Sequence, residues 1–109
     1  RDILGDEVLS FFGRHRAEFG IFGTAGVAAD GSLLEFHSAE VRASERIRQN
    51  ARTSILVIDH SKFGRLAHAL GPNIAEIDRV VLDRRPGPDF DHLIERIADR
   101  LLLAEGDAQ

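Results

Sequence analysis

Three short runs of apolar residues divide the chain and predict buried strands. They cover residues 19–23, 54–58 and 77–82, and the last two are rich in Ile and Val. Strands that are apolar on both sides, instead of alternating with polar residues, are typical of parallel sheets whose two faces are covered. We therefore expect these strands to lie in one parallel sheet.

A helical pattern lies between the first two strands. Ser38 is the predicted N-cap, and Glu40 falls in the first turn, where the helix dipole favours an anion. Small or apolar residues then repeat every four positions and predict the packed face of the helix. These positions are Ala39, Ala43, Ile47 and Ala51.

Two more helices are expected. One follows the breaker cluster at 86–88, with Asp89 near its start. Its predicted apolar positions are Leu93, Ile94, Ile97, Ala98 and Leu101. The other runs from Asp6 or Glu7 to about Phe19, with Val8, Leu9 and Phe12 along one side.

The order of these segments predicts the architecture. It reads helix, strand, turn at Asp30-Gly31, helix, strand, loop or short helix, strand and helix. Alternation of this kind predicts an α/β domain of three layers, with a mainly parallel sheet, flanking helices and right-handed crossovers. No repeat or linker interrupts the chain, so residues 1–109 are interpreted as a single domain.

Composition narrows the possible functions. A length of 109 residues suits one domain, and no apolar run is long enough to cross a membrane. The net charge of −4 argues against the broad positive field of a non-specific DNA-binding surface. Cysteine is absent and the five histidines show no metal-ligand spacing, so neither disulfides nor a metal site is expected.

The start of the chain suggests a fragment. Residue 1 is Arg, the sequence contains no Met, and no secretory signal pattern is present. We interpret the chain as part of a longer cytoplasmic protein.

The main candidate site is the polar run Asp59-His60-Ser61-Lys62 at the end of the second strand. Ligands of open parallel sheets gather beyond the carboxyl ends of the strands. Lys62 could neutralise a phosphate or carboxylate, Ser61 could donate a hydrogen bond, and Asp59 could accept one from a hydroxyl. The alternative is an Asx-type turn with a solvated lysine. A hydrolase triad is disfavoured, because three adjacent residues cannot adopt the geometry of a triad.

Two weaker candidates accompany this run. Gly23, Thr24 and Gly26 follow the first strand, where glycine lets the backbone approach a ligand and the Thr hydroxyl could contact phosphate. Taken by itself this segment is more often an ordinary turn, because no helix follows at once and the dinucleotide-binding fingerprint is not satisfied. Glu40 lies in the first turn of a helix that should also start near the carboxyl edge of the sheet. A surface acid placed there only because the helix dipole stabilises it would show the same pattern.

Longer motifs point to a family. "DHSKFGR" at 59–65, with "EVRASERIRQNART" before it and "LGPNIAEIDRVVLD" after it, resembles the C-terminal sensor domain of the DeoR family of bacterial transcriptional regulators. The upstream "GIFGTAGVAADGSLLEFHSAEVR" is most similar to the glycerol-3-phosphate regulon repressor branch. The resemblance covers about residues 5–104.

The resemblance implies a repressor of two parts. An N-terminal winged helix-turn-helix, absent from this chain, would bind DNA, and the sensor domain would bind a phosphorylated sugar or polyol. The implied protein is a homo-oligomer without a cofactor and is not an enzyme. The implied effector-binding residues are Gly23, Thr24, Gly26, Glu40, Asp59, Ser61 and Lys62.

The sensor domain is similar in turn to ribose-5-phosphate isomerase, which implies the same fold. Glu40 matches the glutamate base of that enzyme, and Lys62 matches the lysine of its Asp-x-Ser-Lys motif. The loop at 23–27 offers no carboxylate where the isomerase carries aspartates. Losing these proton-handling groups should cost catalysis more than binding. An active isomerase and an oligomerisation module with a vestigial pocket are the alternatives.

Overall fold

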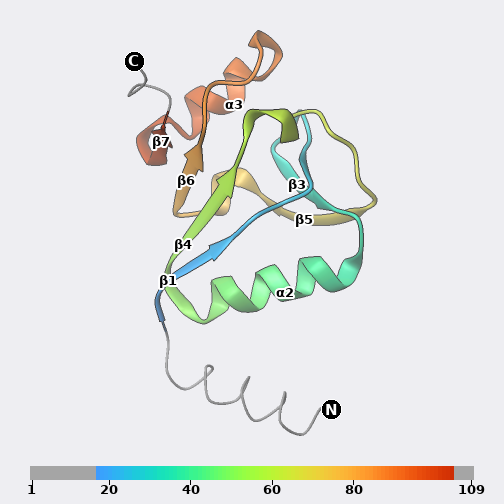
Figure 1. The fold of residues 1–109 in the computed structure, drawn as a ribbon, viewed down its shortest axis with the longest axis vertical. Helices are drawn as coiled ribbons and strands as arrows, with labels where there is room; N and C mark the ends of the chain where they lie inside the picture. Colours follow the sequence, from blue (N-terminus) through green and yellow to red (C-terminus); the bar gives the residue numbers. More distant parts are fainter. Residues whose placement is uncertain (1–16, 105–109) are drawn as a thin grey trace, which may run out of the picture.

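The computed structural model describes residues 17–104 and consists of two sheets with helices (Figure 1). Sheet A contains β1 (Ala17–Phe22), β4 (Ala51–Ile58), β6 (Arg79–Leu82) and β7 (Leu101–Leu103). Its strand order is β1-β4-β6-β7, and every neighbouring pair is parallel. The predicted parallel sheet is therefore confirmed, and β7 is an additional strand that the apolar runs did not predict.

Sheet B is small and antiparallel. It contains β2 (Gly26–Val27), β3 (Ser32–Glu35) and β5 (Ala69–Asn73) in that order. The predicted turn at Asp30-Gly31 joins β2 to β3. The Ser32 amide donates to the Asp30 carboxylate at 2.9 Å, and Gly31 adopts a φ of 93° that favours glycine.

The first described helix, α2, spans Ser38–Gln49. Its N-cap is His37 and not the predicted Ser38, because Glu40 reaches back and accepts a hydrogen bond from the His37 amide at 3.1 Å. The predicted packing face is confirmed only in part. Ala39 and Ala43 are exposed, and Ala51 is a buried residue of β4. Ile47 is 38% exposed, but its side chain lies against Gly20 of β1.

The inward side of α2 follows a different helical repeat. Its half-buried residues are Val41, Ser44 and Arg48, which are three and four positions apart. Two of the three are polar, so the apolar periodicity of the sequence indicates the neighbouring face instead.

The helix α3 spans only Asp91–Arg96 and is shorter than predicted. It lies between the short 3₁₀ helices η3 (Pro88–Phe90) and η4 (Ala98–Arg100). After η4 the chain extends, and Leu101 pairs with Val80 in sheet A. Leu101 was therefore wrongly predicted to be helical, since pairing with a neighbouring strand determines its conformation.

The core lies between sheet A and α3. Leu93, Ile94 and Ile97 are at most 1% exposed and pack against a cluster that includes Leu56 and Leu82. Full burial of each such side chain contributes about 1.5–3 kcal/mol. This packing holds the carboxyl ends of β4 and β6 next to each other.

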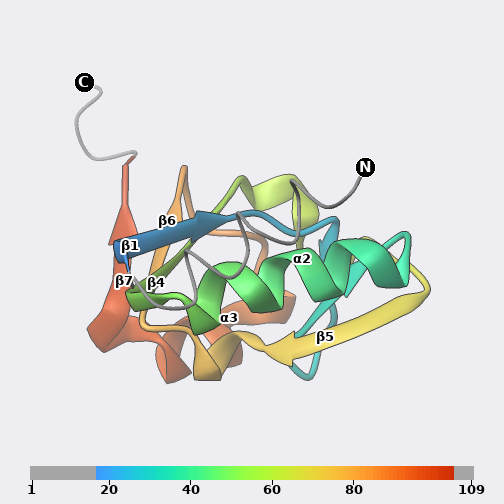
Figure 2. The same cartoon turned by 90° about the horizontal axis from the view of Figure 1, so that it is seen from below.

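Both described helices lie on one face of sheet A (Figure 2). The carbonyl and side chain of Ile47 in α2 approach Gly20 so closely that a Cβ there would lie 2.8 Å from the Ile47 oxygen. Alternate residues of a strand point to opposite faces, so Gly20 and Phe22 share the face that α3 covers.

Some terminal predictions lie outside the described residues. The N-terminal helix is among them up to residue 16. The last part of the predicted N-terminal helix, residues 17–19, belongs to β1 instead. That part of the prediction is wrong.

Candidate effector-binding pocket

A pocket of about 520 Å³ lies across the carboxyl ends of the strands of sheet A. All four strands reach it, as expected for a ligand site of an open parallel sheet. Its polar side chains come from Thr24, Asp59, Lys62 and Asp83. The remaining lining residues are Gly23, Val57, Ile58, Val81, Leu82 and Ala104.

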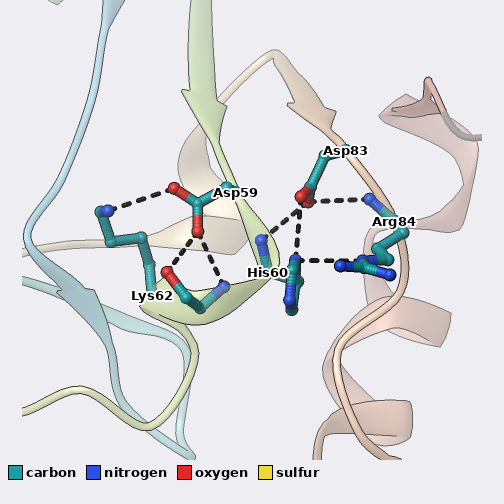
Figure 3. A network of polar contacts seen from close by, with 6 residues as sticks. Asp59, His60, Lys62, Asp83 and Arg84 are labelled. Carbon is teal, nitrogen blue, oxygen red and sulfur yellow. Dashed lines mark hydrogen bonds and ion pairs between the residues drawn. The ribbon is translucent and has the colours of Figure 1, made fainter.

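The turn after β4 is built by Asp59. Its carboxylate, labelled in Figure 3, accepts hydrogen bonds from the amide and the hydroxyl of Ser61, and this geometry starts the 3₁₀ helix η1 (His60–Lys62). These bonds, and the further bond from Lys62, lower the pKa of Asp59 to about 2. The predicted Asx-type turn is therefore present, and Asp59 is a carboxylate at neutral pH.

Lys62 lies at the edge of this pocket. Its Nζ donates to Asp59 Oδ2 at 3.2 Å, and its side chain is only 25% exposed. An ammonium group has three donors, so Lys62 can keep Asp59 and still bind an anion. The sequence contains no other lysine.

A second polar cluster joins the ends of β4 and β6 (Figure 3). Asp83 accepts hydrogen bonds from the His60 amide at 2.7 Å and from the Arg84 amide at 2.8 Å. Its other oxygen lies 2.8 Å from His60 Nδ1, and this hydrogen bond is the main reason that the pKa of Asp83 is lowered.

Arg84 Nε also lies 3.3 Å from His60 Nδ1. One ring nitrogen cannot donate to Asp83 and accept from Arg84 at once. The shorter contact with the carboxylate places the proton on Nδ1, facing Asp83. The cluster fixes the position of the Asp83 carboxylate at the wall of the pocket.

Thr24 is predominantly structural. It is only 8% exposed, and its hydroxyl donates to the Leu34 carbonyl at 2.9 Å, which ties the end of β1 to β3. The hydroxyl predicted to meet a phosphate is therefore already committed, although Thr24 lines the pocket. Gly23 also lines it, and a Cβ there would meet only the Val57 carbonyl at 3.6 Å.

Three predicted site residues do not line this pocket. Glu40 caps α2 through the His37 amide, and Ser61 binds Asp59. Gly26 lets two segments meet, because a Cβ there would lie 2.0 Å from the Arg65 carbonyl oxygen. The structure thus brings Gly23, Thr24, Asp59 and Lys62 together at the pocket and leaves Gly26, Glu40 and Ser61 outside its lining.

Asp83 is a pocket residue that the sequence reasoning missed. The signal was available, because Leu82-Asp83 ends β6 as Ile58-Asp59 ends β4. The carboxyl ends of neighbouring parallel strands meet at the same edge of a sheet. Reading the two strand ends together would have placed both carboxylates at one site.

The chemistry of the pocket suits a small ligand with one anionic group and several hydroxyls. Lys62 provides a cation, Asp59 and Asp83 provide acceptors, and Val57 and Val81 form an apolar side. Within residues 17–104, no three His, Cys, Asp or Glu side chains gather as a metal site would require. No helix in the same range is long and apolar enough to span a membrane.

Comparison with known proteins places this geometry in context. Residues 1–84 match the family described as the DeoR C terminal sensor domain. The glycerol-3-phosphate regulon repressor of Escherichia coli K12 is 45% identical over 84 residues, which are 77% of this chain and 33% of that protein. The repressor of the same name from Haemophilus influenzae is 32% identical over 104 residues, which are 95% of this chain and 40% of that protein.

A more distant relative has a different name. The HTH-type transcriptional repressor GlcR of Bacillus subtilis is 26% identical over 107 residues, which are 98% of this chain and 41% of that protein. The chain therefore spans 33% to 41% of the length of these relatives.

Proposed function

This chain belongs to the DeoR C-terminal sensor domain family, and we propose that its pocket binds the phosphorylated effector of a transcriptional repressor. The effector class is a sugar phosphate or polyol phosphate, and glycerol 3-phosphate is the first candidate. Two relatives whose names refer to the glycerol-3-phosphate regulon motivate this choice. The observation that carries the proposal is the position of Lys62 at the edge of a pocket that spans the sheet.

In the proposed binding mode a cation binds the phosphate of the ligand, and carboxylates bind its hydroxyls. Lys62 pairs with the phosphate, since a charge-assisted hydrogen bond is about twice as strong as a neutral one. Asp59 and Asp83 accept hydrogen bonds from ligand hydroxyls. Both carboxylates remain ionised at neutral pH, because their pKa values are lowered by hydrogen bonds from Ser61 and His60.

Binding without turnover fits the site better than isomerase chemistry. Enolisation of a sugar requires a base close to the carbon that loses its proton. Glu40, the residue that resembles such a base, caps α2 and does not line the pocket. The relatives are named as repressors, which agrees with a regulatory role.

The longer relatives are named as repressors, and we infer from them how the effector controls DNA binding. In the proposed full-length protein, which is a homo-oligomer of the bacterial cytoplasm, an N-terminal helix-turn-helix domain binds the operator. The effector shifts the equilibrium toward a state with low DNA affinity. It can do so only if it binds the two states with different affinities.

Thermal unfolding of the full-length protein tests the effector class. Glycerol 3-phosphate, ribose 5-phosphate and glucose 6-phosphate are compared with glycerol and inorganic phosphate. A ligand that binds only the folded state stabilises it by about 2.7 kcal/mol at one hundred times its Kd, so a phosphorylated ligand should raise the melting temperature. No shift with any phosphorylated compound would contradict the proposal and favour an oligomerisation module.

A further inference from the structure

Asp83 differs from Asp59 in its electrostatic surroundings, although both carboxylates line the pocket. The charge of Asp59 is balanced by Lys62, whose Nζ lies 3.2 Å from Asp59 Oδ2. Asp83 forms no ion pair with an arginine or lysine in the described part of the chain. Arg84 donates to it through the backbone amide, and the Arg84 guanidinium group contacts the His60 ring instead (Figure 3). Asp83 therefore brings a negative charge to the pocket without an arginine or lysine to balance it.

The Asp83 carboxylate also keeps an acceptor site for a ligand. Its Oδ1 accepts hydrogen bonds from the backbone amides of His60 and Arg84, and its Oδ2 lies 2.8 Å from the His60 ring nitrogen. The side chain remains 44% exposed. Each carboxylate oxygen can accept two hydrogen bonds, so Oδ2 can accept one more, and an ionised carboxylate can donate none. A ligand group that contacts Asp83 must therefore be a donor, such as a hydroxyl.

The charges that line the pocket suit a ligand with a single anionic group. The lining contains two carboxylates, Asp59 and Asp83, and Lys62 is the one cation among the described lining residues. A phosphate bound to Lys62 occupies this cation. A second anionic group on the same ligand would meet the carboxylates, and like charges repel strongly where solvent is partly excluded.

We propose that Asp83 makes the pocket accept phosphorylated alcohols and reject phosphorylated acids. This selectivity rests on the effector-binding function proposed above. Glycerol 3-phosphate and 3-phosphoglycerate illustrate it, because the carbon farthest from the phosphate carries a hydroxyl in the first compound and a carboxylate in the second. The hydroxyl donates to Asp83, whereas the carboxylate is repelled. An unfavourable contact with the wrong ligand is an effective source of specificity.

Calorimetric titration of the full-length protein measures the selectivity. The Kd of glycerol 3-phosphate is compared with that of 3-phosphoglycerate, and the Kd of glucose 6-phosphate with that of 6-phosphogluconate. The second pair covers a sugar effector. The titrations are run at pH 8, where imidazole groups are ordinarily neutral. In each pair that binds, the acid should bind at least about tenfold more weakly than its partner.

Asp83→Asn assigns the selectivity to one side chain. The amide oxygen of the new residue can still accept from the backbone amides of His60 and Arg84. Its nitrogen can donate to His60 Nδ1 when the ring carries its proton on Nε2, so the cluster can keep its shape. Because the repulsion is lost, the ratio of the two Kd values should fall at least about fivefold.

Asp89→Asn is the matched control. It removes the same charge from an exposed residue that does not line the pocket, and the ratio should stay unchanged. If thermal denaturation shows that Asp83→Asn is unfolded, Asp83→Ser replaces it, since a serine also removes the charge and keeps a small polar side chain.

The contrary outcomes separate the selectivity from the function on which it rests. An acid that binds as tightly as its partner would overturn the selectivity and leave the effector pocket standing. A ratio that survives the substitution of Asp83, or that falls equally in Asp89→Asn, would overturn the role of this residue. If no compound of either pair binds, the proposed function itself fails, and the selectivity fails with it.

Discussion

The loop after β1 and the turn after β4 both follow parallel strands of sheet A, but they use their polar groups differently. Thr24 in the first loop is buried and donates to the Leu34 carbonyl, so it holds sheet B against sheet A. Asp59 and Lys62 in the second turn are half-buried, bind each other and line the pocket. Polar residues at a strand end can therefore tie the fold together, as Thr24 does, or line the pocket, as Asp59 and Lys62 do.

The energetic reason for this difference is burial. A hydroxyl enclosed by protein must find a protein partner, since an unpaired one costs about 1–3 kcal/mol. A partly exposed ammonium group keeps donors available for a ligand. The loop after β1 should therefore govern stability, and the turn after β4 should govern affinity.

The largest expected effect is on stability, from Gly26→Ala at the start of β2, where the loop after β1 ends. The new Cβ would lie 2.0 Å from the Arg65 carbonyl oxygen, so the backbone must move. We expect a loss of about 2–3 kcal/mol of unfolding free energy in urea denaturation. Gly23→Ala is the control and should change it little, because its Cβ would meet only one atom at 3.6 Å. Equal losses would remove the structural role assigned to Gly26.

Lys62→Ala should have the next largest effect, on affinity. It removes the cation from the turn after β4, and a hydrogen bond between charged groups is worth about 1.5–3 kcal/mol, which is roughly a tenfold to hundredfold change in Kd. Calorimetric titration of the full-length protein with glycerol 3-phosphate measures the change. The control is Arg65→Ala, which removes a cation three residues away that does not line the pocket. This variant should bind glycerol 3-phosphate with the Kd of the unaltered protein. An unchanged Kd in Lys62→Ala would place the phosphate elsewhere.

Thr24→Val should lower stability and leave the affinity for the effector almost unchanged, whereas Lys62→Ala should lower affinity. Losing the hydrogen bond to the Leu34 carbonyl should cost about 1 kcal/mol of stability. The Kd for the effector should stay within about twofold, because the hydroxyl is already committed. A large loss of affinity at unchanged stability would show that Thr24 binds the ligand.

Asp59→Asn should have the smallest effect, which is on stability, and the size of this effect should depend on pH. The pKa of Asp59 is lowered to about 2 in the folded protein, below its usual value of 3.8. A carboxyl with a lowered pKa stabilises the fold above pH 4 and loses this contribution as the pH falls toward 2. The melting temperature of the unaltered protein should exceed that of Asp59→Asn slightly at pH 6, and the two should converge near pH 2. A difference that grows on acidification would reverse the assigned sign.

The sequence predicted the parts of the molecule that depend on local patterns. The apolar runs identified β1, β4 and β6, because strands buried in a parallel sheet contain few polar residues. The motif at 59–65 identified a turn that presents Lys62 to the pocket.

The remaining features depend on contacts between distant segments. Three leucines at 101–103 form β7 because β6 offers a free edge. Asp83 becomes part of the pocket because β6 lies beside β4. The leucine run does not by itself reveal which strand it pairs with, and Asp83 is found only when the ends of two predicted strands are compared.

A crystal structure of the full-length protein with glycerol 3-phosphate would show whether this pocket binds the effector. We expect density for the ligand across the carboxyl ends of β1, β4 and β6, with a phosphate oxygen about 3 Å from Lys62 Nζ and hydroxyls facing Asp59 or Asp83. A ligand bound at another place, or one whose phosphate lies away from Lys62, would contradict this expectation.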